Sequence, residues 1–418
     1  MTTAMQWANA LSTRPSLEAA LNEVTATIQH QLTGKPDLGI VFLSSAFASD
    51  ALRLMPLLLE KLPIPTVIGC LGGGIVGTTS NDIEEIEQGP ALSLSVGHLP
   101  GVTIHPFQID GNQLPDLDGP PQAWIDLIGV DPADNPHFIL LVDPMAGGIT
   151  DLLAGLDFAY PRGNKIGGLA SGGDSMAPGP LFYAQAGRSA PRLYGQGTVG
   201  VALSGAIQVD SIVAQGCRPI GKPFQVTDGE RNIITEIQAI SPSTGELITA
   251  PPLEVLRELV QTLNDSDREL AQTALFVGVA MDSFKLSLQP GDFLIRNLLG
   301  VDPRQGAIAI GDRVRRGQRL QFHLRDAQTS AEDLQFLLSD YLQAHPTSQA
   351  LGALMFSCLG RGTNLYPDAN FDSQVFQRFL PGVPLGGFFC NGEIGPVGQQ
   401  TFLHGYTSAF AILRPANP

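Results

Sequence analysis

Glycine-rich turns directly after short apolar strands recur at three places in this chain, and they restrict how it can fold. The three windows span residues 65–75, 165–173 and 384–394. Around each window the spacing predicts the same order of elements: a strand, a helix, a second strand that runs into the glycine turn, and a return strand after the turn. The first and third windows align without a gap and share three matched positions, Pro65 with Pro384, Gly73 with Gly392 and Ile75 with Ile394. In the middle window Lys165 takes the place of the proline. This recurrence indicates an internal repeat in an α/β chain.

Apolar residues at helical spacing predict the helices between these strands. A first helix begins after Pro15 and Ser16. A second, over residues 49–62, is expected to turn four side chains inward, Leu52, Met55, Leu58 and Leu59. Residues 330–333 resemble a capping box and predict the start of a third helix there.

We therefore expect an α/β fold (mixed α+β) with a duplicated, two-module architecture. Mixed sheets are covered by helices, and the glycine turns converge on a cleft near the module interface. The expected division is an N-terminal helix over residues 1–34, an N-terminal module over 35–214 and a C-terminal module over 215–418. Residues 216–219 interrupt the strand series, and Arg218 is expected to bond backbone carbonyls across the boundary.

Composition excludes several classes of function. The chain has 24 Lys and Arg against 40 Asp and Glu, a net charge of −16, and its largest basic run, at residues 313–319, is short, so nucleic acid is not an expected partner. Its apolar runs are strand-sized, so no membrane-inserted span is expected, and no signal peptide is recognised at the N-terminus. The four cysteines are far apart and the histidines form no ligand pattern, which argues against disulfides, a metal site and a cofactor. A reduced, cytoplasmic protein is the simplest interpretation.

Five segments in order carry a resemblance to a known family. They are residues 215–221, 293–302, 321–326, 356–362 and 387–396. Together they resemble the FIST family, whose members have an N-terminal and a C-terminal FIST module. The resemblance implies a sensory or signal-transduction protein that binds small ligands, with amino acids a proposed class. Family members also occur fused to signalling domains or, with an F-box, in ubiquitin ligases. Since this chain has no room for an output domain, the resemblance implies a separate signalling partner.

The first glycine turn, with Gly72 and Gly73, is a candidate ligand-binding segment. Glycine lets backbone N–H groups approach a ligand, and successive N–H groups can bind an anion. The alternative is that these glycines only allow strands to cross closely. The turn lacks the spacing of a dinucleotide loop, so NAD is not expected. It also lacks the carboxylate that the family's N-terminal turn often carries, which implies that this acid is absent here or has moved.

Cys358, Gly360 and Arg361 follow a predicted buried strand. Arg361 could bind a carboxylate through paired hydrogen bonds, since the flanking glycines are expected to leave its head group uncrowded. A nearby guanidinium would also favour the thiolate of Cys358. The alternative is that Cys358 is a small buried thiol and Arg361 holds a loop carbonyl.

Asn391, Gly392 and Glu393 form the third glycine turn. With Arg361 they would make a complementary pair for a zwitterion. The alternative is that Glu393 pairs with Arg361 itself and locks two loops together.

These residues favour a small-ligand sensor without catalysis. One alternative is a hydrolase that uses Cys358, with His404 or His323 as the base. Another is a scaffold whose acidic surface docks a protein.

Overall fold

The computed structural model describes residues 4–80, 82–173, 180–188, 191–346 and 349–416. The chain divides into two compact units. Unit 1 combines Met1–Ala214 with Leu334–Pro418, and unit 2 is Gln215–Asp333. The first boundary lies where the sequence interrupts its strand series. After Asp333 the chain returns to unit 1, so residues 215–418 do not form one compact block.

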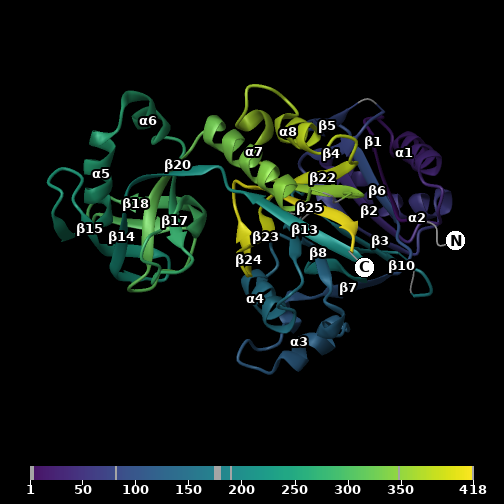
Figure 1. Cartoon of the computed structure of the whole chain (residues 1–418), viewed down its shortest axis with the longest axis horizontal. Coiled ribbons are helices and arrows are strands. Elements are labelled where there is room, and N and C mark those ends of the chain that lie inside the picture. The colour runs from purple at the N-terminus through teal and green to yellow at the C-terminus, as the bar shows by residue number, and fades with distance from the viewer. Residues whose placement is uncertain (1–3, 81, 174–179, 189–190, 347–348, 417–418) are drawn as a thin grey trace. The chain divides into compact units, whose positions relative to one another are not determined.

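Unit 1 contains three six-stranded mixed sheets with the same strand order (Figure 1). In each sheet an edge strand pairs with a return strand, which pairs with the first of two parallel strands. The first sheet contains β1 (Gln6–Ser12), β6 (Leu92–His98), β2 (Leu38–Ser44) and β3 (Thr66–Gly72). The second contains β7 (Val102–Ile109), β12 (Thr198–Gly205), β8 (His137–Val142) and β9 (Lys165–Leu169). The third contains β13 (Ile207–Ala214), β25 (Ser408–Pro415), β21 (Gly352–Cys358) and β22 (Leu385–Cys390).

Each sheet is completed by a hairpin that comes from another part of the chain. After β3, the hairpin β4 (Ile75–Thr78) and β5 (Ile83–Ile86) joins β22 of the third sheet. After β9, the hairpin β10 (Leu181–Gln185) and β11 (Arg192–Tyr194) joins β3 of the first. After β22, the hairpin β23 (Glu393–Val397) and β24 (Gln400–His404) joins β9 of the second. The three sheets therefore exchange hairpins in a cycle.

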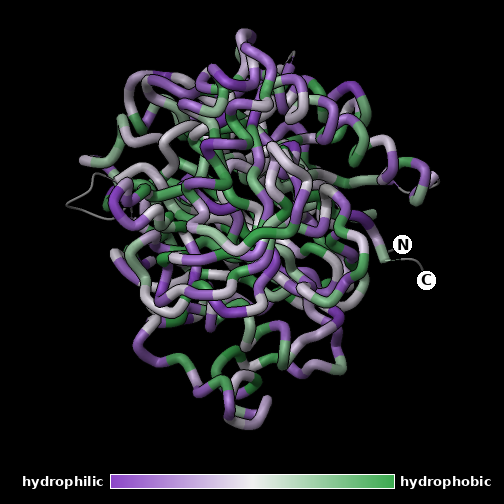
Figure 2. Tube along the Cα trace, turned by 90° about the vertical axis from the view of Figure 1, so that its left-hand side faces the viewer, coloured by the Kyte–Doolittle hydropathy of each residue, from purple (hydrophilic) through white to green (hydrophobic). Residues whose placement is uncertain are grey.

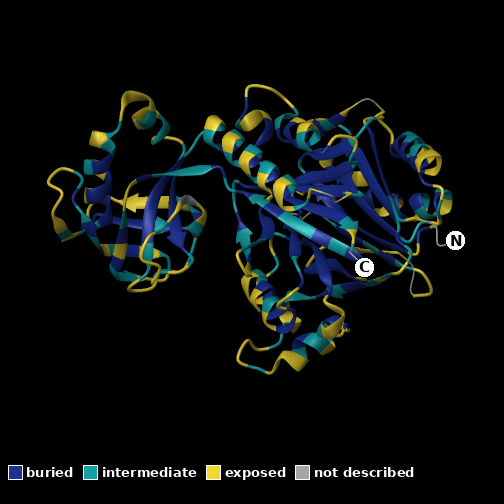
Figure 3. Ribbon diagram, viewed as in Figure 1, coloured by how far each residue is buried: buried dark blue, intermediate teal, exposed yellow. Residues whose placement is uncertain are grey.

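A shared core joins the inner faces of these sheets, and helices cover the outer faces. Phe42, Ile139 and Phe356, one from each sheet, lie in the same buried cluster. The outer helices are α1 (Leu17–Gln31) and α2 (Ala51–Lys61) on the first sheet, α3 (Pro121–Ile128) and α4 (Ile149–Ala159) on the second, and α7 (Ala327–Ala344) and α8 (Phe371–Phe379) on the third. Figure 3 shows these strands buried and the helices exposed on one side. Strands buried on both faces read as continuous apolar runs, as β2 and β8 do.

Two details of the expected helices are wrong. Leu52 is 73% exposed, because the buried stripe of α2 consists of Ala51, Leu54, Met55 and Leu58. The helix predicted to start at residue 330 begins at Ala327. Asp326 accepts a hydrogen bond from the Thr329 N–H at 2.7 Å, as an N-cap does, whereas Ser330 donates to the Gly216 carbonyl.

Short 3₁₀ segments punctuate the connections. They are η1 (Ser45–Asp50), η2 (Gly111–Gln113), η3 (Pro132–Asp134), η4 (Pro290–Asp292) and η5 (Gly362–Asn364). Figure 2 colours the Cα trace by hydropathy and shows apolar and polar segments following one another closely along the chain. Among the described residues, no helix combines the length and apolar character needed to cross a bilayer.

Unit 2 is a closed β-barrel. Its strands run in the order β14 (Cys217–Glu230), β20 (Arg319–Arg325), β17 (Leu275–Ala280), β18 (Phe293–Asp302), β19 (Ala307–Ile310) and β15 (Ile233–Ile240), and β14 pairs again with β15. The strand β16 (Leu247–Ala250) adds to β15, and α5 (Pro252–Thr262) packs on the barrel core. A shorter helix, α6 (Asp265–Leu270), follows α5. Closure leaves few free sheet edges.

Within the described residues, the guanidinium of Arg218 is held by carboxylates and not, as expected, by backbone carbonyls. It lies in β14 and forms ion pairs with Asp326, at 2.9 Å, and with Asp267. Both partners belong to unit 2, so Arg218 ties barrel segments together.

Candidate functional site

The three glycine turns converge inside unit 1, at the carboxyl ends of β3, β9 and β22. Ser171 is the residue that connects them. Its hydroxyl accepts a hydrogen bond from Gly73 N–H at 2.8 Å and donates one to the Phe389 carbonyl. In addition, Asn391 N–H donates to the Leu169 carbonyl at 3.1 Å. Ligands of α/β proteins commonly bind at the carboxyl ends of parallel strands, so this convergence is the natural candidate site.

Close packing explains the glycines of the first turn. A Cβ on Gly72 would lie 2.9 Å from both the Gly74 carbonyl oxygen and Phe388 Cβ, which is closer than real Cβ contacts allow. A Cβ on Gly73 would lie 2.7 Å from Leu359 Cδ2. Gly72 therefore has a packing role, and the Gly73 N–H is already bonded to the Ser171 hydroxyl.

Arg361 is fully buried, and its head group is held by protein partners. Nε and Nη2 donate to the two oxygens of Asp372 at 2.7 and 2.9 Å, and Nη2 also donates to the Tyr366 hydroxyl at 2.6 Å. Burial alone would lower the pKa of Arg361, but the Asp372 carboxylate raises it, so the guanidinium stays charged. The expectation of an uncrowded head group is wrong, because η5 and α8 close over it. Asp372 already occupies the paired donors expected to bind a ligand.

One nitrogen of Arg361 remains available. Among the polar side-chain atoms that the structure describes, Arg361 Nη1 is buried without a hydrogen-bond partner, and so is Glu393 Oε1. Asp372, not Glu393, is the ion-pair partner of Arg361, so the alternative in which Glu393 locks onto Arg361 is not what is observed. A buried polar atom without a hydrogen bond lowers the stability of the folded state, so each such atom needs an explanation, and a bound ligand is one.

Glu393 begins β23 and is also fully buried. Its Oε2 accepts from the N–H and the hydroxyl of Thr407 at 3.0 and 2.8 Å. Burial raises the pKa of Glu393 to about 8, against the lowering effects of Thr407 and Arg361. Burial therefore favours the protonated carboxyl group, whereas a cation beside Oε1 would favour the charged form.

Sequence reasoning missed the carboxylates around Arg361. Glu85 on β5 accepts from Ser373 N–H at 2.7 Å, and burial followed by the nearby Asp372 raises the pKa of Glu85 to about 7. Glu87 accepts from the N–H and hydroxyl of Thr363 at 2.8 and 2.9 Å. The turn at residues 72–75 has no acid, but the hairpin that follows it brings two acids to the third repeat. An acidic run in a charge-poor chain was the available signal.

The remaining predicted residues lie near the same turns. Gly360 is half-buried, and its N–H donates to Cys358 Sγ at 3.4 Å. Cys358 lies opposite Cys390 in the parallel register of β21 and β22. Asn391 is exposed, and its side chain donates to the Ala170 carbonyl at 3.2 Å, while Gly392 is buried. Burial raises the pKa of the Cys390 thiol well above its usual value, which makes Cys390 a poor nucleophile.

The histidines proposed as bases have other contacts. His404 Nε2 lies 3.0 Å from the Gly395 carbonyl. His323 belongs to unit 2, where Nδ1 lies 3.0 Å from the Gln321 carbonyl and burial lowers its pKa to about 4. No group of three or more potential metal-ligating side chains is found within the described ranges.

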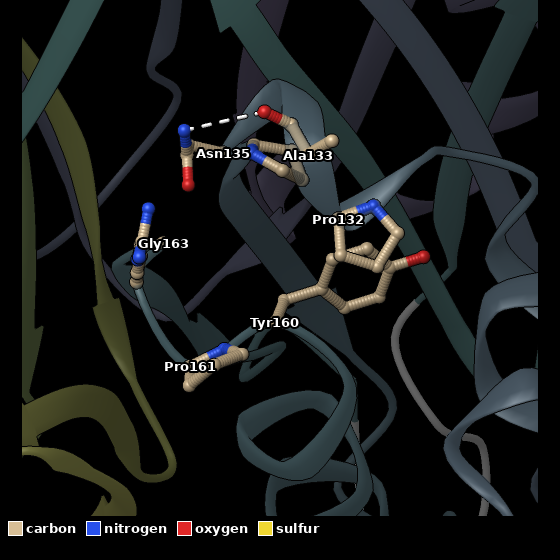
Figure 4. Close-up of a pocket in the computed structure, with 8 residues that line it drawn as sticks. Pro132, Ala133, Asn135, Tyr160, Pro161 and Gly163 are labelled. Carbon is tan, nitrogen blue, oxygen red and sulfur yellow. Dashed lines mark hydrogen bonds between the residues drawn. The ribbon is translucent and has the colours of Figure 1, made fainter.

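A separate cavity of about 400 Å³ lies between η3 and the end of α4 (Figure 4). Its lining includes Asn135, Tyr160 and Gly163 together with Pro132, Ala133, Pro136, Pro161 and Arg162. None of the predicted site residues contributes to it. With one charged side chain and three prolines, it offers few groups for specific recognition.

Comparison with known proteins places this chain in a family. The model of the FIST N domain matches residues 37–240, and the model of the FIST C domain matches residues 252–396. An uncharacterized protein of Mycobacterium tuberculosis is 33% identical over 96% of this chain and 98% of its own length. Human F-box only protein 22 is 32% identical over 21% of this chain and 25% of its own length. The solved structure of a cyanuric acid hydrolase from A. caulinodans covers 99% of this chain and 100% of its own, at 8% identity and a TM-score of 0.36, which is too low to support any conclusion. The two domain matches and the full-length relative show that the chain belongs to the FIST family.

Proposed function

We propose that this protein is a non-catalytic sensor that binds an amino acid or a similar small metabolite where the glycine turns converge, and that it acts on a separate partner. FIST domains are associated with signal transduction and small-ligand sensing. The observation that carries the proposal is the pair of fully buried groups, Arg361 and Glu393, each with one unpartnered polar atom.

The chemistry of this pair suits a zwitterion. A ligand carboxylate would accept from Arg361 Nη1, and a ligand ammonium would face Glu393 Oε1. Gly72, Gly73, Cys358, Gly360, Asn391 and Gly392 would form the walls. A ligand held by both charged groups would link the loop after β21 to β23, which provides a physical route from binding to a change of shape.

A thermal-shift screen of amino acids and related metabolites tests this proposal. A ligand that binds only the folded protein raises the melting temperature by mass action. We expect at least one hit for the natural sequence and none for Glu393→Gln, which preserves shape but cannot become negative. Glu84→Gln on β5 is the matched control and should retain the shift. A hit that Glu393→Gln also retains would contradict the placement of the site.

Two other outcomes correspond to the alternatives. If no metabolite shifts melting and Cys358 is alkylated much faster than the other thiols, a cysteine hydrolase becomes the better proposal. If no metabolite shifts melting and Cys358 is inert, a docking scaffold becomes the better one.

A further inference from the structure

Two loops of the barrel unit combine exposed apolar side chains with positive charge. In the connection from β17 to β18, Phe284 is 94% exposed and Leu286 is 100% exposed, with Lys285 between them. The loop from β19 to β20 carries Arg313, Arg315 and Arg316 and ends at Arg319. These seven residues are called the basic tip below.

Hydrogen bonds join the two loops into one surface. Arg319 N–H donates to the Ser283 hydroxyl at 3.3 Å, and Arg319 Nη1 donates to the Lys285 carbonyl at 2.5 Å. The Asp282 carboxylate accepts from Phe284 N–H at 2.8 Å and fixes the turn that carries the apolar pair. The loop that carries Phe284 and Leu286 is therefore tied to the loop that carries the arginines.

Part of the charge at the basic tip is not neutralised by the protein. Arg316 pairs with Asp228, and Lys285 pairs with Asp292 at 2.7 Å. Within the described part of the chain, the guanidinium groups of Arg313 and Arg315 have no ion-pair partner and both residues are exposed. Exposed arginines without partners are free to meet external anions.

The distribution of charge along the chain points the same way. Residues 215–333 contain 13 of the 24 basic residues but only 16 of the 40 acidic ones. The remainder of the chain, unit 1, therefore has 11 basic against 24 acidic residues. Unit 2 is the least acidic part of the protein, and the basic tip is its main cluster of exposed cations.

We propose that the basic tip docks on an anionic lipid surface. Acidic headgroups would meet Arg313 and Arg315, and Phe284 and Leu286 would enter the headgroup region. Such a contact is peripheral and differs from a membrane-spanning segment. Moving large, almost completely exposed apolar side chains out of water is favourable in free energy, and the adjacent cations favour a surface with negative charge. This proposal is independent of the ligand site in unit 1.

Co-sedimentation of the full-length protein with lipid vesicles tests the proposal. We expect binding to vesicles of phosphatidylcholine mixed with phosphatidylserine, little binding to pure phosphatidylcholine, and weaker binding as salt rises. The double variant Arg313→Gln with Arg315→Gln should lower the partition coefficient by about tenfold or more. The double variant Phe284→Ser with Leu286→Ser should also lower it by about tenfold or more.

Two matched double variants serve as controls. Leu52→Ser with Phe336→Ser removes two exposed apolar side chains of unit 1, and Arg257→Gln with Arg378→Gln removes two exposed arginines of α5 and α8. Both should bind vesicles like the natural sequence, and all variants should melt at a similar temperature. The proposal is overturned if the protein does not bind vesicles that contain phosphatidylserine at low salt. It is also overturned if a control variant weakens binding as much as its test variant, or if binding is retained when Phe284 and Leu286 are replaced. Absence of vesicle binding would leave an acidic protein as the better occupant of the tip.

Discussion

At the scale of single residues, the candidate site is a cluster of buried charged side chains, two of which have a polar atom that makes no hydrogen bond within the described residues. Arg361 is neutralised by Asp372, while Nη1 of Arg361 and Oε1 of Glu393 have no hydrogen-bond partner among the residues that the structure describes. Sequence alone singled out Arg361 and Glu393 as candidates, because charged residues in glycine-flanked turns stand out when only 15% of residues are charged. It could not locate Asp372 or Tyr366, because their role depends on how η5 and α8 fold back over the guanidinium.

Removing the partner of Arg361 should destabilise the protein strongly. The change Asp372→Asn leaves a buried guanidinium without a compensating charge, and we expect a loss of about 3–5 kcal/mol in the free energy of unfolding. Urea unfolding measures this loss. Asp368→Asn, an exposed change in the segment just before α8, is the control and should cost less than about 0.5 kcal/mol. Equal effects of the two changes would show that the ion pair is not structural.

At the scale of elements, most strands and helices follow from the apolar pattern. The strands β2 and β8 are recognisable as buried apolar runs, and α1 begins directly after Ser16 as predicted, with the Ser16 hydroxyl accepting from Ala19 N–H. The predictions were wrong where contacts with neighbouring segments, and not residue type, determined the position of a side chain. Leu52 is a residue type that is often found in a hydrophobic core, but it lies beside the buried stripe of α2 and not within it. Ser330 has the right type for a cap but bonds to Gly216 instead.

The hydroxyl of Ser171 should hold the three turns together. In Ser171→Ala, the Gly73 N–H and the Phe389 carbonyl lose their shared partner, so we expect a cost of about 1–3 kcal/mol. Hydrogen exchange at the Gly73 amide should accelerate in the same variant. Ser45→Ala, in the exposed start of η1, provides the comparison and should change neither quantity. If Ser171→Ala behaves like Ser45→Ala, the turns are held by packing alone.

At the scale of the whole molecule, unit 1 is a cycle of three sheets, and the barrel is inserted between β13 and α7. The chain predicts that turns after β3, β9 and β22 resemble one another, but nothing in the sequence says that each hairpin joins another sheet. That exchange depends on pairings between segments far apart in the chain, such as Gly387 with Val76 and Glu393 with Gly168. Long-range pairings of this kind are invisible to local periodicity.

Buried acids should make stability depend on pH. The pKa of Glu393 is raised to about 8 and that of Glu85 to about 7, from an ordinary value of 4.5. The folded state therefore holds protons that the unfolded chain releases above about pH 4.5. The contribution of these two groups to the free energy of unfolding is therefore greatest below about pH 4.5, and it falls as the pH rises toward 8.

Melting temperatures measured across this range check the prediction. Glu393→Gln should flatten the decline, because its side chain does not titrate, and Glu84→Gln should leave the slope of the natural sequence unchanged. A slope that is the same in all three proteins would mean that Glu393 does not hold a proton in the folded state.

The proposed binding site for a small ligand lies where the three glycine turns meet. The most direct measurement is a crystal structure of the protein with the metabolite that gives the largest thermal shift. We predict ligand atoms within hydrogen-bonding distance of both Arg361 Nη1 and Glu393 Oε1, with the Arg361–Asp372 pair retained. A ligand bound elsewhere, with both atoms still unpartnered, would contradict the account.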